Sequence, residues 1–143
     1  MSQNSREVTV LLVEDDDGDM KLVQRAFKKA HIANTLVRAV DGIEALDMLR
    51  GTNGKPRIAR PFIVFADINM PRMDGLTLVR TLREDSNLKD TIVFMLTTSK
   101  HEDDKNAAYD LNVAGYILKE NAGYDFLDLM SLVGGYSRVV ELP

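Results

Sequence analysis

The chain has 143 residues and a net charge of -4, and this length suits one domain that buries a full hydrophobic core. It contains no cysteine, which excludes a disulfide framework and a thiolate metal site. Basic residues form no stripe that would favour nucleic acid, and no apolar stretch reaches the roughly 20 residues that span a bilayer. We therefore expect a cytoplasmic protein with neither a nucleic-acid nor a membrane partner. A polar, disordered start is expected over residues 1–7, and one domain over residues 8–135.

The first apolar run extends from Val8 to Val13 and is followed directly by acidic residues. A short apolar run of this kind, bounded by polar residues, predicts a strand buried on both faces. From Asp16 to Ala30 the apolar residues recur at the spacing of a one-faced helix, with acids in its first turn and lysines in its last. We expect these acids, Asp16, Asp17 and Asp19, to stabilise the start of this helix rather than to bind a metal ion.

A second strand is predicted over Thr35–Val40, where Arg38 interrupts the apolar run and favours a place at the edge of the sheet. The pair Asp41–Gly42 then opens a helix whose inner face is formed by Ile43, Leu46 and Leu49. Residues 51–57 are dense in turn-forming residues and predict an exposed loop.

The rest of the chain repeats this alternation of strands and helices. Strands are predicted over Phe62–Ala66, Thr91–Leu96 and Ala114–Leu118. The helices between them have as inner residues Leu76, Val79 and Leu82, then Ala107, Ala108 and Leu111. A last helix ends at Gly134–Gly135 and contains Phe126, Leu127, Leu129, Met130, Leu132 and Val133. Residues 136–143 form a tail whose Val139, Val140 and Leu142 would be unusual in a free terminus, and we expect it to act as a dimer arm.

The strict alternation of strands and helices predicts a parallel sheet with helices on both faces. Five strands joined by right-handed crossovers predict an α/β fold of the flavodoxin-like, doubly wound type, with strand order 2-1-3-4-5. The chain contains no internal repeat and no interdomain linker.

Polar side chains follow four of the predicted strands, and in this order they meet at the carboxyl edge of the sheet. They are Glu14 with Asp15, then Asp67, Thr97 and Lys119. Three neighbouring carboxylates repel one another unless protons or a hard cation such as Mg²⁺ neutralise them. A carboxylate that attacks phosphorus gives an aspartyl phosphate, and a hydroxyl and an ammonium can hold its oxygens. The pattern therefore predicts a Mg²⁺-dependent phosphoryl site with Asp67 as the nucleophile.

Four motifs in this order resemble those of the receiver domain of bacterial response regulators. They are Leu11–Asp15, Asp67–Pro71 with Asp74–Gly75, Leu96–Ser99 and Gly115–Lys119. The resemblance covers nearly the whole chain, roughly residues 8–133. Each motif alone is weak, but four motifs in order at the expected strand ends are together a strong signal.

The resemblance implies a role for each matching residue. Asp67 would accept a phosphoryl group from a sensor histidine kinase, and the protein would catalyse only its own phosphorylation and dephosphorylation. Thr97 and Lys119 would contact the phosphoryl oxygens, and Tyr116 would be an aromatic switch that turns inward when Thr97 moves. The Mg²⁺ ligands would be Glu14, Asp15, Asp67 and the main-chain carbonyl of Asn69.

A narrower resemblance connects the chain to the single-domain regulators that partner bacterial phytochromes. It is carried by Asp15–Asp19, Leu96–Ser99, the long loop before Phe62 and the ending Tyr136–Pro143. It implies a phytochrome-type photoreceptor kinase as partner, and output by protein contact without an output domain.

The chain departs from the receiver pattern at two places. Many receivers place a proline in a cis peptide after the lysine of the fifth strand, whereas Glu120 follows Lys119 here, so the conformation of this peptide is open. Glu14 is longer than the usual Asp, and we expect it to reach the metal through water.

Three alternative functions share this fold. A Mg²⁺-dependent phosphatase of the haloacid dehalogenase kind would need a second Asp where Asn69 stands, which argues against turnover of external substrates. A flavin or nucleotide carrier would need a glycine-rich or hydroxyl-rich loop after the first strand, where acids here repel phosphate. A scaffold of the same fold that is never phosphorylated would have no use for the complete set of Asp67, Thr97 and Lys119.

Overall fold

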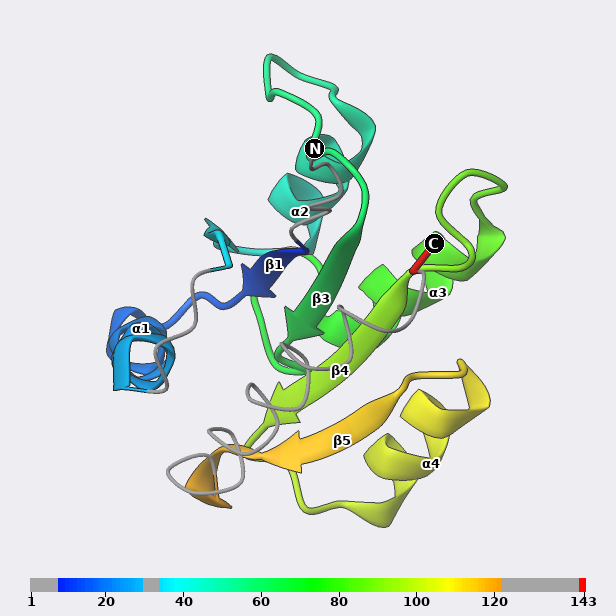
Figure 1. Cartoon of the computed structure of the whole chain (residues 1–143). Helices are drawn as coiled ribbons and strands as arrows, with labels where there is room; N and C mark the ends of the chain where they lie inside the picture. Colours follow the sequence, from blue (N-terminus) through cyan, green and yellow to red (C-terminus); the bar gives the residue numbers. More distant parts are fainter. Residues whose placement is uncertain (1–7, 30–33, 122–141) are drawn as a thin grey trace.

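The computed structural model describes residues 8–29, 34–121 and 142–143, and within them the chain forms a five-stranded parallel sheet (Figure 1). The sheet order is β2-β1-β3-β4-β5, which confirms the predicted flavodoxin-like arrangement. The strands are β1 Thr9–Val13, β2 Leu36–Ala39, β3 Phe62–Ala66, β4 Ile92–Thr97 and β5 Gly115–Leu118. The helices are α1 Asp17–Lys29, α2 Gly42–Arg50, α3 Gly75–Glu84 and α4 Glu102–Asp110, with a 3-10 turn at Lys119–Asn121.

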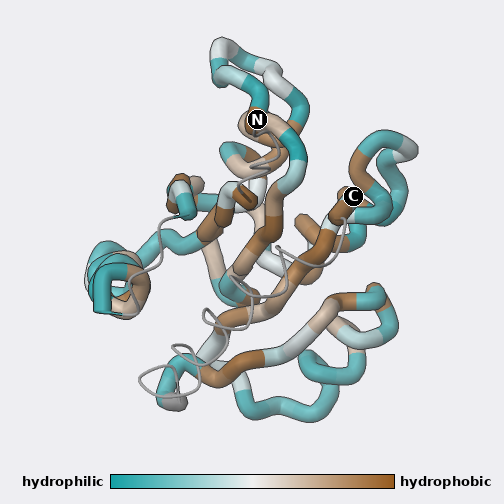
Figure 2. Tube along the Cα trace, in the orientation of Figure 1, coloured by the Kyte–Doolittle hydropathy of each residue, from teal (hydrophilic) through white to brown (hydrophobic). Residues whose placement is uncertain are grey.

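The central strands are the most hydrophobic part of the chain, and the helices around them are largely hydrophilic (Figure 2). Strand β3 is buried at every position, as expected for a strand covered on both faces. The inward residues of β1 alternate between two core clusters: Leu11 and Val13 belong to one, Val10 and Leu12 to the other. This alternation places a separate hydrophobic core on each side of the sheet.

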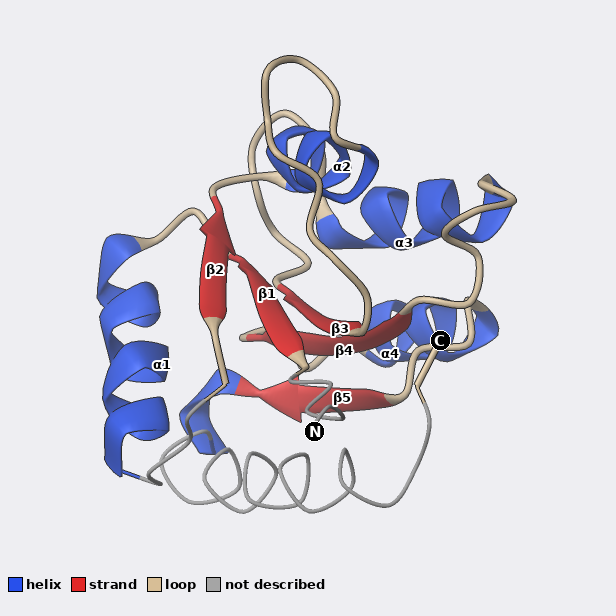
Figure 3. Cartoon of the chain, turned by 45° about the horizontal axis from the view of Figure 1, so that its top comes forward, coloured by secondary structure: helices blue, strands red, loops and turns tan. Residues whose placement is uncertain are grey.

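Helices cover both faces of the sheet, which confirms the prediction. Helix α1 packs through Met20, Val23 and Phe27 on one face, whereas α2, α3 and α4 share the core of the other face (Figure 3). Leu142 packs against the same core as α1. The predicted last helix, residues 1–7 and the tail up to residue 141 lie outside the described residues. Within the part that the structure describes, no helix is long and apolar enough to cross a membrane.

Short polar side chains determine where the helices begin. Asp41 caps α2 by accepting a hydrogen bond of 2.9 Å from the Glu44 amide, and Asp74 caps α3 in the same way. Asp16 accepts a hydrogen bond of 2.8 Å from the Asp19 amide at the start of α1, which confirms its predicted place there. Helix α2 ends at Arg50, and the following residue, Gly51, has a φ of 71°, a left-handed conformation that glycine adopts without a steric penalty.

The predicted element boundaries differ from the observed ones by single residues. Thr91 does not join β4, because its amide and its hydroxyl both donate to the Leu88 carbonyl and close a turn. Thr97 instead extends β4 and pairs with Leu118 of β5.

Ile43, predicted on the inner face of α2, is only half-buried, because Gly42 and Ala45 take the buried positions.

One guanidinium joins α3 to the two loops that precede β4 and β5. Arg83 donates hydrogen bonds of 2.7 to 3.1 Å to the backbone carbonyls of Lys89, Thr91, Leu111 and Asn112. We expect Arg83→Met to lower the free energy of unfolding by about 2 kcal/mol, because these carbonyls would lose charged donors. Urea unfolding would measure the loss, with the exposed Arg80→Met one turn earlier as the control. Equal stabilities of the two variants would contradict this role.

Candidate functional site

The strand register brings the predicted site residues to one edge of the sheet. Val13 pairs with Ala66, and Ala66 pairs with Met95, so the residues that follow β1 and β3 lie beside the end of β4. Thr97 pairs with Leu118, which places Lys119 at the same edge. This is the carboxyl edge where ligands bind in open parallel sheets.

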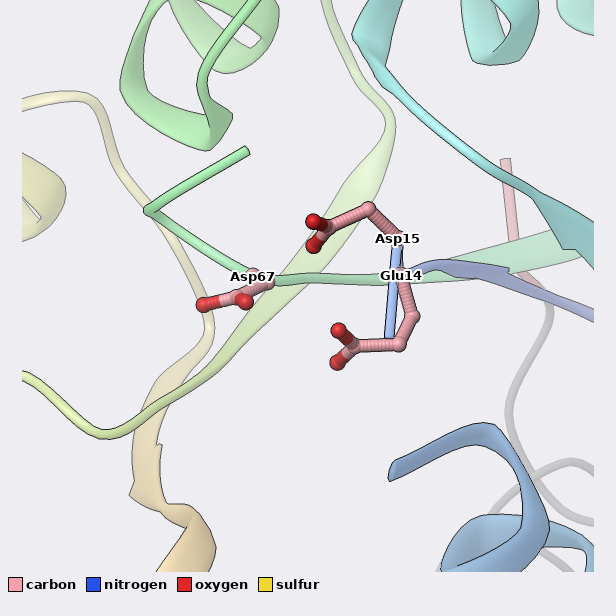
Figure 4. Close-up of side chains that lie close together, drawn as sticks. All are labelled: Glu14, Asp15 and Asp67. Atoms are coloured by element: carbon pink, nitrogen blue, oxygen red, sulfur yellow. The ribbon is translucent and has the colours of Figure 1, made fainter. Parts of the chain in front are cut away.

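Three carboxylates gather at this edge. The closest ligand atoms of Glu14, Asp15 and Asp67 all lie within 4.8 Å of one another, and their side chains face one common space (Figure 4). Glu14 and Asp67 are buried, whereas Asp15 is exposed, so the cluster is open to solvent on one side. An all-oxygen donor set with an open side is the kind of site that a hard divalent cation occupies. The cluster can therefore hold a metal ion.

Glu14 is the most buried carboxylate of the site, with 1% of its surface exposed. Burial raises its pKa, although hydrogen bonds from Lys119 and from the Asp16 amide work in the opposite direction. Its two carboxylate oxygens accept these bonds at 2.8 Å from the Lys119 ammonium and at 3.1 Å from the amide. A carboxylate in this setting binds either a cation or a proton more readily than an exposed one.

Lys119 brings a positive charge into contact with three carboxylates at the site. Its Nζ lies 2.6 Å from Asp19, 2.8 Å from Glu14 and 3.1 Å from Asp67. Burial alone would lower the pKa of Lys119, but hydrogen bonds to Asp19 and Glu14 and the charge of Asp67 raise it overall. The lysine is therefore a fixed cation beside Asp67. Asp19 lies at the start of α1 as predicted, and its contact with Lys119 adds a second role that the sequence did not indicate.

The backbone around Asp67 is held from two sides. Its amide donates to the Val13 carbonyl at 3.1 Å, and the Gly75 amide donates to the Ile68 carbonyl at 2.9 Å. A Cβ atom at position 75 would lie only 2.1 Å from the Asp67 carbonyl oxygen. Gly75 therefore allows α3 to approach the site, a role that the Asp74–Gly75 motif signalled but that the sequence reasoning did not assign.

Thr97 and Tyr116 are linked through one residue, Ser99. The Ser99 amide donates to the Thr97 hydroxyl at 3.1 Å, and the Tyr116 hydroxyl donates to the Ser99 carbonyl at 2.9 Å. The Ser99 hydroxyl in turn donates to Asp104 of α4 at 2.6 Å. Burial raises the pKa of Tyr116, so its hydroxyl stays protonated as a donor. Neither Ser99 nor Asp104 was identified from the sequence as part of this link.

Arg38 explains the polar interruption in β2. Its Nε donates to the Glu14 carbonyl at 3.0 Å, and its guanidinium pairs with Asp17 at 2.7 Å. The strand is at the sheet edge as predicted, and the arginine additionally fixes the backbone from which the acidic cluster projects.

The peptide bond between Lys119 and Glu120, whose conformation the sequence left open, is trans in the structure. Among the described residues the one cis peptide bond is Arg60–Pro61, so the Lys119–Glu120 peptide is trans. This peptide begins the 3-10 turn, and Glu120 pairs with Lys100 at 2.8 Å on the surface.

Comparisons with known proteins, by family model, by sequence and by structure, all find response regulators. The family model described as the response regulator receiver domain matches residues 10–130. Response regulator Rcp1 of Synechocystis sp. is 34% identical over 138 residues, which cover 94% of this chain and 92% of that protein. The crystal structure of a phosphorylated cyanobacterial phytochrome response regulator, RcpA, has a TM-score of 0.81 at 30% identity, covering 96% of this chain and 99% of that one. The Mn²⁺-bound form of response regulator Rcp1 has a TM-score of 0.76 at 31% identity, covering 95% and 99%.

Proposed function

The chain belongs to the response regulator receiver family and is related to the phytochrome response regulators, and on this premise we propose that Asp67 accepts a phosphoryl group from a sensor histidine kinase. The observation that carries the proposal is the contact of 3.1 Å between the Lys119 ammonium and the carboxylate of Asp67, with Glu14 and Asp15 alongside. A buried carboxylate beside a fixed cation and a cation-binding cluster suits attack on a phosphoryl group.

We propose Mg²⁺ as the ion of this site, with Asp15, Asp67 and the main-chain carbonyl of Asn69 as ligands and with Glu14 reaching the ion through water. The all-oxygen donor set and its open side support this choice, as does the Mn²⁺-bound form of the related Rcp1. When bound, the ion would neutralise the negative charge that the carboxylates and the phosphodonor bring together.

The proposed transfer is a displacement at phosphorus. A carboxylate oxygen of Asp67 forms the new P–O bond while the P–N bond to the kinase histidine breaks, and the electron pair of that bond returns to the imidazole nitrogen. Lys119 holds one phosphoryl oxygen through its ammonium. The Thr97 hydroxyl already accepts from Ser99, and its own hydrogen is able to donate to a second phosphoryl oxygen.

We propose that Thr97 transmits the phosphorylation to the surface through Ser99. Movement of the Thr97 hydroxyl toward the phosphoryl group would pull on the Ser99 amide, and the carbonyl of Ser99 is the acceptor of Tyr116. Tyr116 would then change its position, and α4 would follow through Asp104. The output of the domain is a contact with another protein on this surface.

The relationship to phytochrome response regulators supports a phytochrome-type photoreceptor kinase as the partner. We propose that the two proteins meet in the cytoplasm. We also propose that the protein forms a homodimer through residues 136–143. Transfer from a phytochrome kinase that is faster than transfer from an unrelated histidine kinase would support this partnership, and equal rates would contradict it.

We expect a small phosphodonor such as acetyl phosphate, with Mg²⁺, to add one phosphoryl group to the wild type, and Asp67→Asn to remain unlabelled. Intact-protein mass spectrometry measures the addition, and its loss in mild base identifies an acyl phosphate. Asp41→Asn is the matched control, because Asp41 is also buried, caps a helix and can be replaced by Asn in that role. Labelling of Asp67→Asn at the wild-type level would refute Asp67 as the acceptor.

A further inference from the structure

The carboxylate nearest to the Lys119 ammonium does not come from a strand end. Asp19, in the first turn of α1, lies 2.6 Å from Nζ, closer than Glu14 at 2.8 Å or Asp67 at 3.1 Å. An ammonium carries three hydrogens, and these three carboxylates can use all of them. Asp19 is outside the acidic cluster that can hold a metal ion.

The position of Asp19 is set by the start of α1. Its amide donates to the Asp16 carboxylate at 2.8 Å, which fixes the turn that carries the side chain. Asp19 and Lys119 are 100 residues apart in the chain, and their hydrogen bond connects α1 to the end of β5. Only 13% of the Lys119 side chain is exposed, so this contact is shielded from solvent more than an ordinary surface ion pair.

We propose that Asp19 is a positioning residue for phosphoryl transfer, which holds the Lys119 ammonium in place beside Asp67. This inference rests on the proposed function of Asp67. Once Asp67 carries a phosphoryl group, its carboxylate has lost its charge, and the Nζ hydrogen that it accepted becomes available to a phosphoryl oxygen. Asp19 and Glu14 keep the other two hydrogens, so the ammonium exchanges one partner without moving.

The geometry favours positioning over competition. If Asp19 competed with Asp67 for the lysine, the two contacts would be alternatives. Instead the ammonium contacts both carboxylates in the same structure, at 2.6 and 3.1 Å. A lysine side chain has several rotatable bonds, and a second charged acceptor on a different element restricts its ammonium to one place.

The test compares Asp19→Ala with Asp19→Asn under the same acetyl phosphate and Mg²⁺ concentrations. Loss of a charge-assisted hydrogen bond to the lysine should slow phosphorylation about tenfold in Asp19→Ala. Asn keeps an oxygen acceptor, so its rate should recover to within about threefold of the wild type. Asp103→Asn is the control, since it removes an equal charge from the first turn of α4. Thermal melting of all variants checks that α1 is intact.

A second measurement asks whether Asp19 acts through Lys119. In the Lys119→Met background, Asp19→Ala should have no further effect on the rate, because the group that it positions is gone. An Asp19→Ala rate equal to or above that of the wild type would overturn the inference, as would an equal loss in both backgrounds. Failure of the wild type itself to be labelled would instead refute the proposed function.

Discussion

Gly75→Ala is expected to abolish phosphorylation of Asp67 and to lower the free energy of unfolding by about 3 kcal/mol. The added Cβ would lie 2.1 Å from the Asp67 carbonyl oxygen and 2.9 Å from both its carbonyl carbon and the Met95 methyl group. Met95 can move, but the backbone of Asp67 is tied to Val13 through a hydrogen bond of 3.1 Å. Either α3 or the acceptor residue must therefore shift, and a small displacement of the nucleophile is costly for transfer.

The control separates the loss of stability from the loss of position. Gly54 has a φ of 80° in an exposed loop, and a Cβ added there would meet no atom within 4 Å, so Gly54→Ala costs about 1–2 kcal/mol through its backbone alone. It should keep wild-type phosphorylation, measured by mass spectrometry after exposure to acetyl phosphate, while urea unfolding reports its stability. A Gly75→Ala protein that is phosphorylated at the wild-type rate would show that the close approach of α3 has no role in the site.

Much of the fold followed from local patterns in the chain. The run Phe62–Ala66 is apolar at every position and is a fully buried strand with the predicted bounds. Once the strand order is known, the carboxyl-edge rule places Glu14, Asp15, Asp67, Thr97 and Lys119 together, and each of them lies there. These predictions succeeded because they needed only the period of hydrophobicity and the direction of the strands.

The contacts of Arg38 and Asp19 that support the site could not be predicted from local patterns, because they join elements that are distant in the chain. In the sequence Arg38 is only a polar residue that interrupts a strand. The register of β2 beside β1 is what brings its side chain to the Glu14 carbonyl. In the sequence Asp19 is only an acid at the start of a helix, and its distance from Lys119 depends on how α1 packs against the sheet. Ser99 belongs to a recognised motif, but its linking role depends on the folded arrangement, because its amide, carbonyl and hydroxyl each bond to a different element.

Lys119→Met is expected to lower the free energy of unfolding at neutral pH by about 3 kcal/mol, although the two side chains have similar lengths. The change removes the cation that lies within 3.1 Å of three carboxylates, of which Glu14 and Asp67 are buried. Breaking a buried pair by removing one partner leaves an uncompensated charge, which costs more than the pair itself is worth. Lys100→Met is the control, because Lys100 pairs with Glu120 on the surface and should cost less than about 1 kcal/mol.

The loss should depend on pH in a defined direction. Burial already raises the pKa of Glu14 above its ordinary value of 4.5, and the Lys119 hydrogen bond is the largest influence that lowers it. Without the lysine this pKa rises further, so the folded state of the variant binds a proton that the unfolded chain releases. Stability of this origin is present below the unfolded value and is lost as the pH rises through the folded one. Urea unfolding between about pH 5 and pH 8 should therefore show a steeper fall for Lys119→Met than for the wild type.

Two further measurements identify the carboxylates as the cause of the loss. Glu14→Gln in the Lys119→Met background should restore part of the stability at pH 8 and flatten the pH dependence, because it removes the buried charge and keeps the side-chain shape. Mg²⁺ should raise the stability of Lys119→Met through the same carboxylates, since a ligand that binds only the folded state stabilises it increasingly as the ligand concentration rises above its Kd. A Lys119→Met protein whose unfolding is unaffected by pH, by Mg²⁺ and by Glu14→Gln would mean that the lysine stabilises the fold by packing alone. In that case the charge of Lys119 would not be what stabilises the carboxylates, and its contact with Asp67 at 3.1 Å would no longer support phosphoryl transfer to that residue.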